Sequence, residues 1–276
     1  MAHRDWRHYK RAKHSRSAGY FREIPLHLDL AFYAAAIPAV ILMGLAKGGF
    51  SGVGQISVPL LAIIVSPVQA AAILLPILLV QDAVGVWAFR HNWDAHILKV
   101  MVPGAAVGIG AGYLLAAKVS VSAVLGTLGA ISILFALYQL WGRRAARTQA
   151  SPPRSSAPMG FALGIASGFT SQIAHAGLPP FQMWVLRKKL APATYIGTAA
   201  LFFAIINWVK VPAYAALGQF TRENLFAALT LMPVAIASTF AGVALVRRVP
   251  AEGFYTAIYL LMIAVGGQLI WKALGG

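Results

Sequence analysis

Long apolar runs follow one another along this chain, and each has enough residues to cross a lipid bilayer. A helix of roughly 20 apolar residues spans the roughly 30 Å of hydrocarbon. Only 11% of the residues are charged and 59% are hydrophobic, whereas soluble domains carry roughly 25% charged residues. A membrane barrel would instead show weak alternating segments of about ten residues. The sequence therefore predicts an all-α polytopic membrane protein.

The chain is strongly basic, with 23 Lys and Arg against 7 Asp and Glu and a net charge of +16. The charge gathers in the N-terminal tail and between the apolar runs, where it orients membrane helices and meets anionic lipid. We therefore expect a lipid bilayer and no nucleic acid as partner. The absence of Cys excludes disulfides, thiolate metal sites and Cys nucleophiles. The sequence does not indicate an oligomeric state.

Two related glycine-rich stretches interrupt the apolar runs. Residues 44–59 read GLAKGGFSGVGQISVP, and residues 164–179 read GIASGFTSQIAHAGLP. Lipid cannot satisfy unpaired backbone groups, so such breaks occur only within protein or beside a watery cavity. Matching breaks in two halves of a chain indicate the binding site of a transporter.

An internal repeat extends beyond these breaks. Gly44 and Pro59 recur 120 positions later, while Pro103 and Trp141 recur 130 positions later. We predict a basic cytoplasmic tail (1–27), a first transmembrane repeat (28–141), an Arg/Pro/Ser-rich linker (142–157) and a second repeat (158–276). The expected fold has about eight transmembrane helices in two four-helix halves, each opening with a broken helix, either discontinuous or a hairpin. Four crossings per half would make the repeats parallel, whereas hairpins would make them inverted.

Four ionisable residues lie at membrane depth, where each costs about 3 kcal/mol or more and needs a reason. Lys47 would sit beside a bound anion, or its side chain would reach the interface. His175, with an ordinary pKa near neutrality, would contact the anion, carry a proton, or only join two helices. Asp82 would bind a proton or cation, or neutralise a nearby Lys. Lys210 would serve the anion or extend toward the interface.

Neutral donors fill out both breaks and the neighbouring runs, and they suit an oxyanion as well as helix–helix hydrogen bonding. Small residues spaced four apart at Gly104, Gly108 and Gly112, with Ser238 and Gly242, indicate close helix packing. We expect no catalytic residue, metal or cofactor. The predicted substrate-binding residues are Lys47, Gly48, Gly49, Ser51, Gln55, Ser171, Gln172, His175, Thr198, Asn207 and Lys210, with Asp82 and His175 as coupling candidates.

At these residues the chain resembles the sulfite exporter TauE/SafE family. The resemblance covers roughly residues 30–272 and is carried by residues 44–59 with 68–71, by 167–180, and by 197–203 with Asn207, Lys210 and Tyr214. It implies duplicated four-helix halves and transport of sulfite, sulfonates or related anions. Residues 54–56 read GQI where many members have glycines, and Leu178 replaces a usual Gly. These departures concern the particular substrate.

Together these features predict a secondary transporter that exports a small sulfur-containing anion by alternating access between the repeats. It would be a multi-pass protein of the inner (plasma) membrane with a cytoplasmic tail. The alternatives are an anion channel and an intramembrane enzyme. The enzyme has little support, because no acid near Ser171 and His175 in sequence would orient the His.

Overall fold

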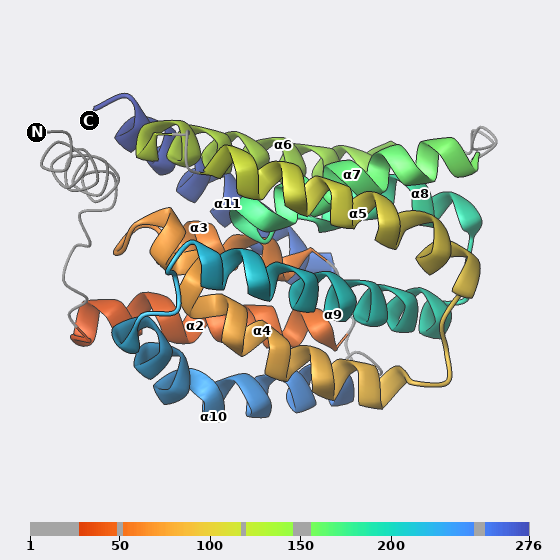
Figure 1. The fold of residues 1–276 in the computed structure, drawn as a ribbon, viewed down its shortest axis with the longest axis horizontal. Coiled ribbons are helices and arrows are strands. Elements are labelled where there is room, and N and C mark those ends of the chain that lie inside the picture. Colours follow the sequence, from red (N-terminus) through yellow and green to blue (C-terminus); the bar gives the residue numbers. More distant parts are fainter. Residues whose placement is uncertain (1–27, 49–51, 117–119, 146–155, 246–251, 276) are drawn as a thin grey trace, which may run out of the picture.

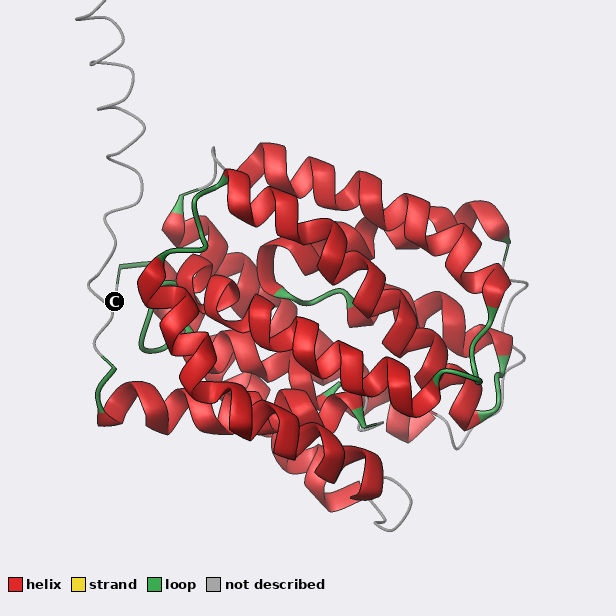
Figure 2. Cartoon of the chain, turned by 60° about the horizontal axis from the view of Figure 1, so that its bottom comes forward, coloured by secondary structure: helices red, strands yellow, loops and turns green. Residues whose placement is uncertain are grey.

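The computed structural model describes residues 28–48, 52–116, 120–145, 156–245 and 252–275, and within them every regular element is a helix (Figures 1 and 2). The predicted tail and most of the predicted linker lie outside the described residues. Six described helices are long and apolar enough to cross a membrane. They are α2 (Leu30–Lys47), α4 (Pro67–Phe89), α5 (Ala95–Ala116), α6 (Val121–Ala145), α9 (Pro192–Ala216) and α10 (Arg222–Leu245).

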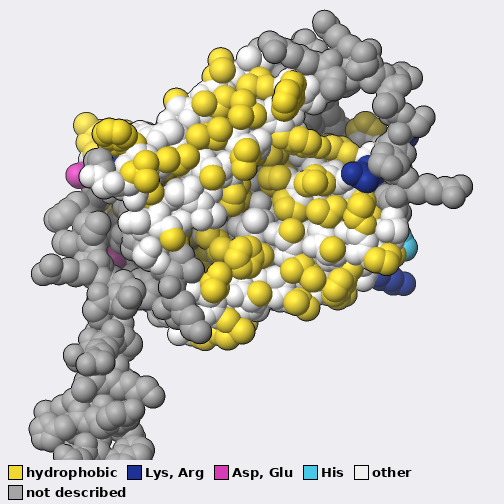
Figure 3. Space-filling model, turned by 90° about the horizontal axis from the view of Figure 1, so that it is seen from above, with side chains coloured by type: hydrophobic (Ala, Val, Ile, Leu, Met, Phe, Trp, Pro, Cys, Tyr) yellow, Lys and Arg dark blue, Asp and Glu magenta, His cyan; other side chains and the backbone are white. Residues whose placement is uncertain are grey.

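The remaining helices are α7 (Ala157–Ala174) and α11 (Glu252–Ala273), with the short elements η1 (Val53–Ile56), α3 (Ser57–Leu61), α8 (Leu178–Val185) and η2 (Leu186–Lys188). Large apolar side chains such as Leu114, Leu134 and Trp141 point outward, each more than 60% exposed. Figure 3 shows how broadly apolar side chains cover one face. Such a surface suits lipid rather than water, so the chain is a multi-pass membrane protein.

Each glycine-rich break lies at the closed end of a helical hairpin. In the first hairpin Ser57 of α3 donates a hydrogen bond to the carbonyl of Ala39, so α3 runs back along α2. In the second, α8 runs back along α7, because the Trp184 indole donates to the carbonyl of Ser156. Of the two predicted alternatives, the hairpin is therefore correct. The discontinuous helix, in which each broken run would continue across the membrane, is wrong.

Each hairpin packs against a helix from the other half of the chain. Helix α2 lies along α10, where a Cβ on Gly48 would meet the Gly242 backbone carbon at 2.0 Å. Helix α7 lies along α5, where a Cβ on Gly168 would meet the Ala105 carbonyl oxygen at 2.0 Å. The predicted packing role of the small residues is confirmed, since Gly108 and Gly242 lie in these same two seams.

Helices α4 and α9 pack antiparallel at the centre. The start of α9 meets the end of α4, where Gly197 lies against Phe89 and Asn92, and Asn207 further along α9 meets Asp82. Helices α6 and α11 also pack antiparallel, with Gly129 against Gly266 and Gln139 hydrogen-bonded to Tyr259. Ser66 caps α4 by accepting a hydrogen bond from the Gln69 amide, and Pro67 starts the helix.

Candidate functional site

A cavity of about 100 Å³ lies where the closed ends of the two hairpins meet α4 and α9. A space of about 10–15 Å³ on this measure holds one water, so the cavity admits a small solute. Its polar wall is made by six side chains from both hairpins and α9: Lys47, Gln55, Ser57, Ser171, His175 and Asn207. Met43, Leu178 and Phe203 contribute to an apolar wall.

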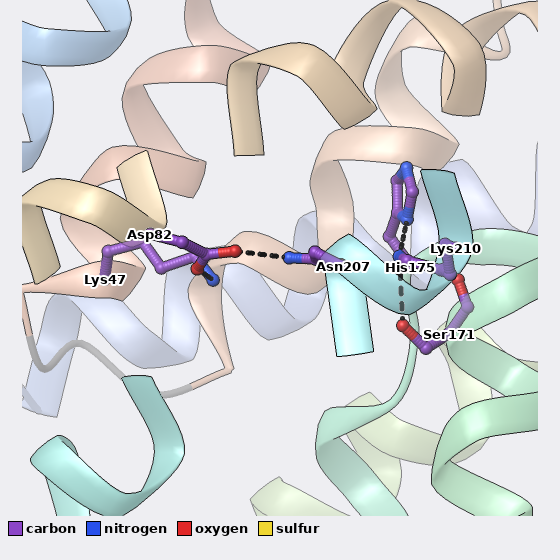
Figure 4. A network of polar contacts seen from close by, with 6 residues as sticks. All are labelled: Lys47, Asp82, Ser171, His175, Asn207 and Lys210. Atoms are coloured by element: carbon purple, nitrogen blue, oxygen red, sulfur yellow. Dashed lines mark hydrogen bonds and ion pairs between the residues drawn. The ribbon is translucent and has the colours of Figure 1, made fainter. Parts of the chain in front are cut away.

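Lys47 ends α2, and its ammonium pairs with the carboxylate of Asp82 on α4 (Figure 4). The Lys47 side chain is 13% exposed, whereas that of Asp82 is 1% exposed. The second carboxylate oxygen of Asp82 accepts a hydrogen bond of 2.6 Å from the Asn207 amide. Asp82 therefore neutralises a nearby Lys, as one of the two sequence interpretations predicted, and it is positioned by groups from α2 and α9.

The backbone places His175 in an unusual conformation. His175 ends α7 with φ of 52°, in the left-handed region where helix ends usually carry Gly or Asn. Its Nε2 lies 2.9 Å from the carbonyl oxygen of Ala71, and because a carbonyl only accepts, Nε2 carries the proton. Its Nδ1 lies 2.7 Å from Lys210 Nζ and accepts from it. The ring is thus held neutral by two partners and stacks on Tyr214.

Lys210 is fully buried in the last third of α9. Its ammonium donates to the carbonyl and hydroxyl oxygens of Ser171 at 3.3 and 3.2 Å, in addition to His175. Among the described residues the one ion pair is that of Lys47 and Asp82, so no carboxylate lies within ion-pair distance of Lys210, although Asp82 acts on it at longer range. The interpretation in which Lys210 extends to the interface is wrong, because its side chain has no exposed surface.

The structure brings together five of the predicted substrate-binding residues at the cavity wall: Lys47, Gln55, Ser171, His175 and Asn207. Lys210 lies directly behind Ser171 and His175. The side-chain oxygen of Gln55 is buried without a hydrogen-bond partner in the described chain. Gly49 and Ser51 lie outside the described residues.

Three predicted residues lie elsewhere, each with a structural task. Gly48 packs on the α10 backbone and has no surface on the cavity. Gln172 packs against Gly112, and its carbonyl accepts from Tyr214. Thr198 accepts a hydrogen bond from the Asp94 amide beside the start of α5. Of the three, only Thr198 uses a polar side chain in these contacts, whereas the Gln172 side-chain oxygen is buried without a hydrogen-bond partner in the described chain. Sequence alone does not separate such roles from ligand contacts.

Ser57 and the apolar wall residues, Phe203 among them, were not in the predicted set of substrate-binding residues. The Phe203 ring lies 5.6 Å from Lys47 Nζ, within range of a cation–π interaction. Spacing along α9 is the signal that could have found it, since Phe203 lies one turn before Asn207. Within the described part of the chain, no group of three or more His, Asp or Glu residues is arranged to hold a metal ion.

The site thus offers two ammonium groups, one carboxylate, one neutral imidazole, and several hydroxyl and amide groups. The sulfite exporter TauE/SafE family matches residues 36–269, which is most of the chain. The chain belongs to this family. Membership in the TauE/SafE family makes the protein a membrane transporter of the sulfite-exporter type. No curated protein and no solved structure matches the chain.

Proposed function

We propose that this TauE/SafE protein is a secondary transporter that exports a small sulfur oxyanion, such as sulfite or an organosulfonate. The observation that carries the proposal is the cavity between the two hairpins with Lys47 in its wall. Neither hairpin alone encloses the space. The anion therefore binds between the two halves of the chain, as solutes do in other transporters built from repeats.

The charge around the cavity favours an anion. With Lys210 in its ammonium form, the cluster holds two positive charges, the neutral imidazole of His175 and the one carboxylate of Asp82. The cluster thus has one positive charge in excess. An uncompensated charge at membrane depth is costly, and a bound oxyanion would compensate it. Ser171 and Asn207 at the wall add donors for its oxygens.

The wall also suits a substrate that is charged at one end only. Met43, Leu178 and Phe203 face the cavity alongside the polar groups. A sulfonate carries an organic group on the sulfur, which these side chains would contact while Lys47 and the donors hold the oxygens. A site for the most compact inorganic anions alone has no need of such a surface.

We further propose that the two repeats are inverted and that the cavity opens alternately to the two sides. The antiparallel packing of α4 on α9 and of α6 on α11 supports this, because equivalent helices related by an axis in the membrane plane run in opposite directions. Pro67 and Pro192, which start α4 and α9, are 125 positions apart, as are Asp82 and Asn207. The hairpins give each half an odd number of crossings.

The inner (plasma) membrane and a cytoplasmic tail remain part of the proposal. Helix α2 begins at the end of the bundle where Gln69 of α4 donates a hydrogen bond to Asn224 of α10. Arg90 and residues 187–189 lie at the opposite end, so the positive charges of the two ends compete in setting the orientation. Because the chain has no Cys, a single Cys at His91 or Glu223 can be labelled selectively. Opposite accessibility is expected, with Glu223→Cys labelled from the cytoplasm.

Counterflow in proteoliposomes tests the function. Labelled sulfite should enter vesicles preloaded with unlabelled sulfite, and thiosulfate or methanesulfonate outside should inhibit that entry, whereas acetate should not. Flux no greater than in protein-free vesicles would refute the proposal. Electrical recording separates a carrier from a channel, because a channel with these residues in a continuous pore would give currents far above carrier turnover.

A further inference from the structure

The ion pair at the cavity wall contains a proton-binding site that couples to the anion. We propose that Asp82 takes up a proton when an anion takes its place as the partner of Lys47, so that anion and proton cross the membrane together. The proposal rests on the proposed anion transport, and export then runs down the outward gradient of the anion and carries one proton out with it. It adds the coupling ion and assigns its site to one carboxylate.

The geometry places Lys47 between two possible partners. Its ammonium contacts Asp82 on one side, while its side chain contributes to the cavity wall on the other. Asp82 is buried behind it and has no surface on the cavity. An anion in the cavity therefore competes with Asp82 for the same ammonium. When Lys47 turns to the anion, the Asp82 carboxylate loses the ammonium paired directly with it at membrane depth.

A buried carboxylate without a counter-ion is strongly disfavoured, and uptake of a proton removes its charge. One O–H bond forms on the Asp82 oxygen that Lys47 leaves, and the proton comes from the water that the cavity meets. Nothing is oxidised or reduced. The other oxygen keeps its hydrogen bond from Asn207, so the neutral acid stays in position.

Few other groups in the described chain can substitute for Asp82 in this exchange. Helix α9 presents Asn207 and Lys210, and the end of α7 presents His175, which lies beyond Asn207 and is already paired with Lys210 (Figure 4). The short helix α3 has no titratable residue. Helix α10 carries Arg222 and Glu223 only in its first turn, and the charged residues of α6 lie in its last turn.

The charge count gives the expected stoichiometry. With Asp82 ionised and the cavity empty, the two lysines and Asp82 sum to one positive charge. With a monovalent anion bound and Asp82 protonated, the sum is again one positive charge. One proton per monovalent anion thus leaves the charge of the moving protein unchanged. A monovalent sulfonate should cross without moving net charge.

Proteoliposomes of the full chain, with labelled sulfite as probe and the voltage clamped at zero, test the coupling. In the wild type an imposed proton gradient should raise sulfite flux in its own direction several-fold, and downhill sulfite flux should move protons. Asp82→Asn, whose amide resembles the protonated acid, should lose both responses. Asp94→Asn removes an acid outside the site and should keep both.

Wild-type flux that ignores the proton gradient, or coupling that survives in Asp82→Asn, would overturn the inference. Absence of any sulfite counterflow in the wild type would instead refute the proposed function itself. If Asp82→Asn does not fold, infrared difference spectra of the wild type decide. Sulfite should produce a new protonated-carboxyl band, and a spectrum without that band would reject the proton site.

Discussion

Two lysines reach the tips of the two hairpins in different ways. Lys47 ends the first helix of its hairpin, touches the cavity and is paired with Asp82. Lys210 belongs to α9, has no exposed surface, and reaches the tip of the second hairpin at Ser171 and His175. One cation is partnered by an opposite charge and lies at the wall, whereas the other is held by neutral groups behind it.

This difference suggests that the two lysines have separate tasks. Lys47 can exchange its carboxylate for a ligand, because both lie within reach of one ammonium. Lys210 orients His175 through the contact between its Nζ and the ring Nδ1. The seams that hold the two hairpins, by contrast, are alike, since both depend on glycine against backbone. The lysines should therefore respond differently to substitution, and the seams should respond in the same way.

Lys47→Ala should have the largest effect. Anion flux should fall by about 100-fold or more, and removal of one partner of a buried ion pair should cost about 3–5 kcal/mol of stability. The double variant Lys47→Ala with Asp82→Asn should recover most of the stability and none of the flux. Proteoliposome flux and thermal unfolding in detergent measure the two quantities. Normal anion flux in Lys47→Ala would contradict the proposal that Lys47 binds the anion directly.

Gly48→Ala and Gly168→Ala should each destabilise the protein by about 1–3 kcal/mol, because the added methyl forces apart helices that touch through backbone. Gly110→Ala is the matched control, since a Cβ there meets nothing within 4 Å. Thermal unfolding of the three variants provides the measurement. A cost at one seam without a comparable cost at the other would show that the hairpins are held differently.

Lys210→Met should reduce anion flux by about tenfold, which corresponds to about 1.4 kcal/mol, while leaving stability unchanged or improved. Replacing a buried lysine that has no carboxylate within ion-pair distance by an apolar side chain of similar length removes a desolvation cost. Lys47→Met is the comparison and should lose both flux and stability. Equal destabilisation in the two Met variants would mean that Lys210 has a stabilising partner equivalent to Asp82.

His175→Asn should have the smallest effect, a loss of about threefold in flux at low anion concentration. Asn tolerates the left-handed conformation at the end of α7 but is too short to keep both the Ala71 and Lys210 contacts. The loss should appear in the apparent anion affinity rather than in the maximal rate, measured from flux against concentration. His175→Gly, which suits the backbone equally well, provides the control for conformation.

The sequence predicts the helices well because long apolar runs at membrane depth have few alternatives. It also locates the two hairpin tips, since glycine-rich polar segments stand out against those runs. It does not give the direction of the chain after each break. A run from residue 28 to 65 is too long for one helix, but its length is the same whether α3 continues across or turns back along α2.

The sequence predicts only the part of the site that lies in the two glycine-rich breaks. Lys47, Gln55, Ser171 and His175 lie in the breaks themselves, where composition is informative. The partnership of Asp82 with Asn207 joins residues 125 positions apart, and no local pattern signals it. In sequence, Thr198 resembles a substrate-binding residue, yet its hydroxyl accepts a hydrogen bond from the Asp94 amide beside the start of α5. A hydroxyl that satisfies a backbone group and one that binds a solute look the same in a sequence.

The exchange of partners between the halves, α2 with α10 and α7 with α5, bears on how the protein is made. When the ribosome has completed α6, the glycine-lined face of α2 still lacks its partner, which is synthesised about a hundred residues later. Until α10 is synthesised, the glycine-lined face of α2 contacts lipid or an insertion factor. The nascent chain is therefore vulnerable to degradation until α10 arrives, and cutting the gene at the linker should yield two fragments that accumulate only when co-expressed.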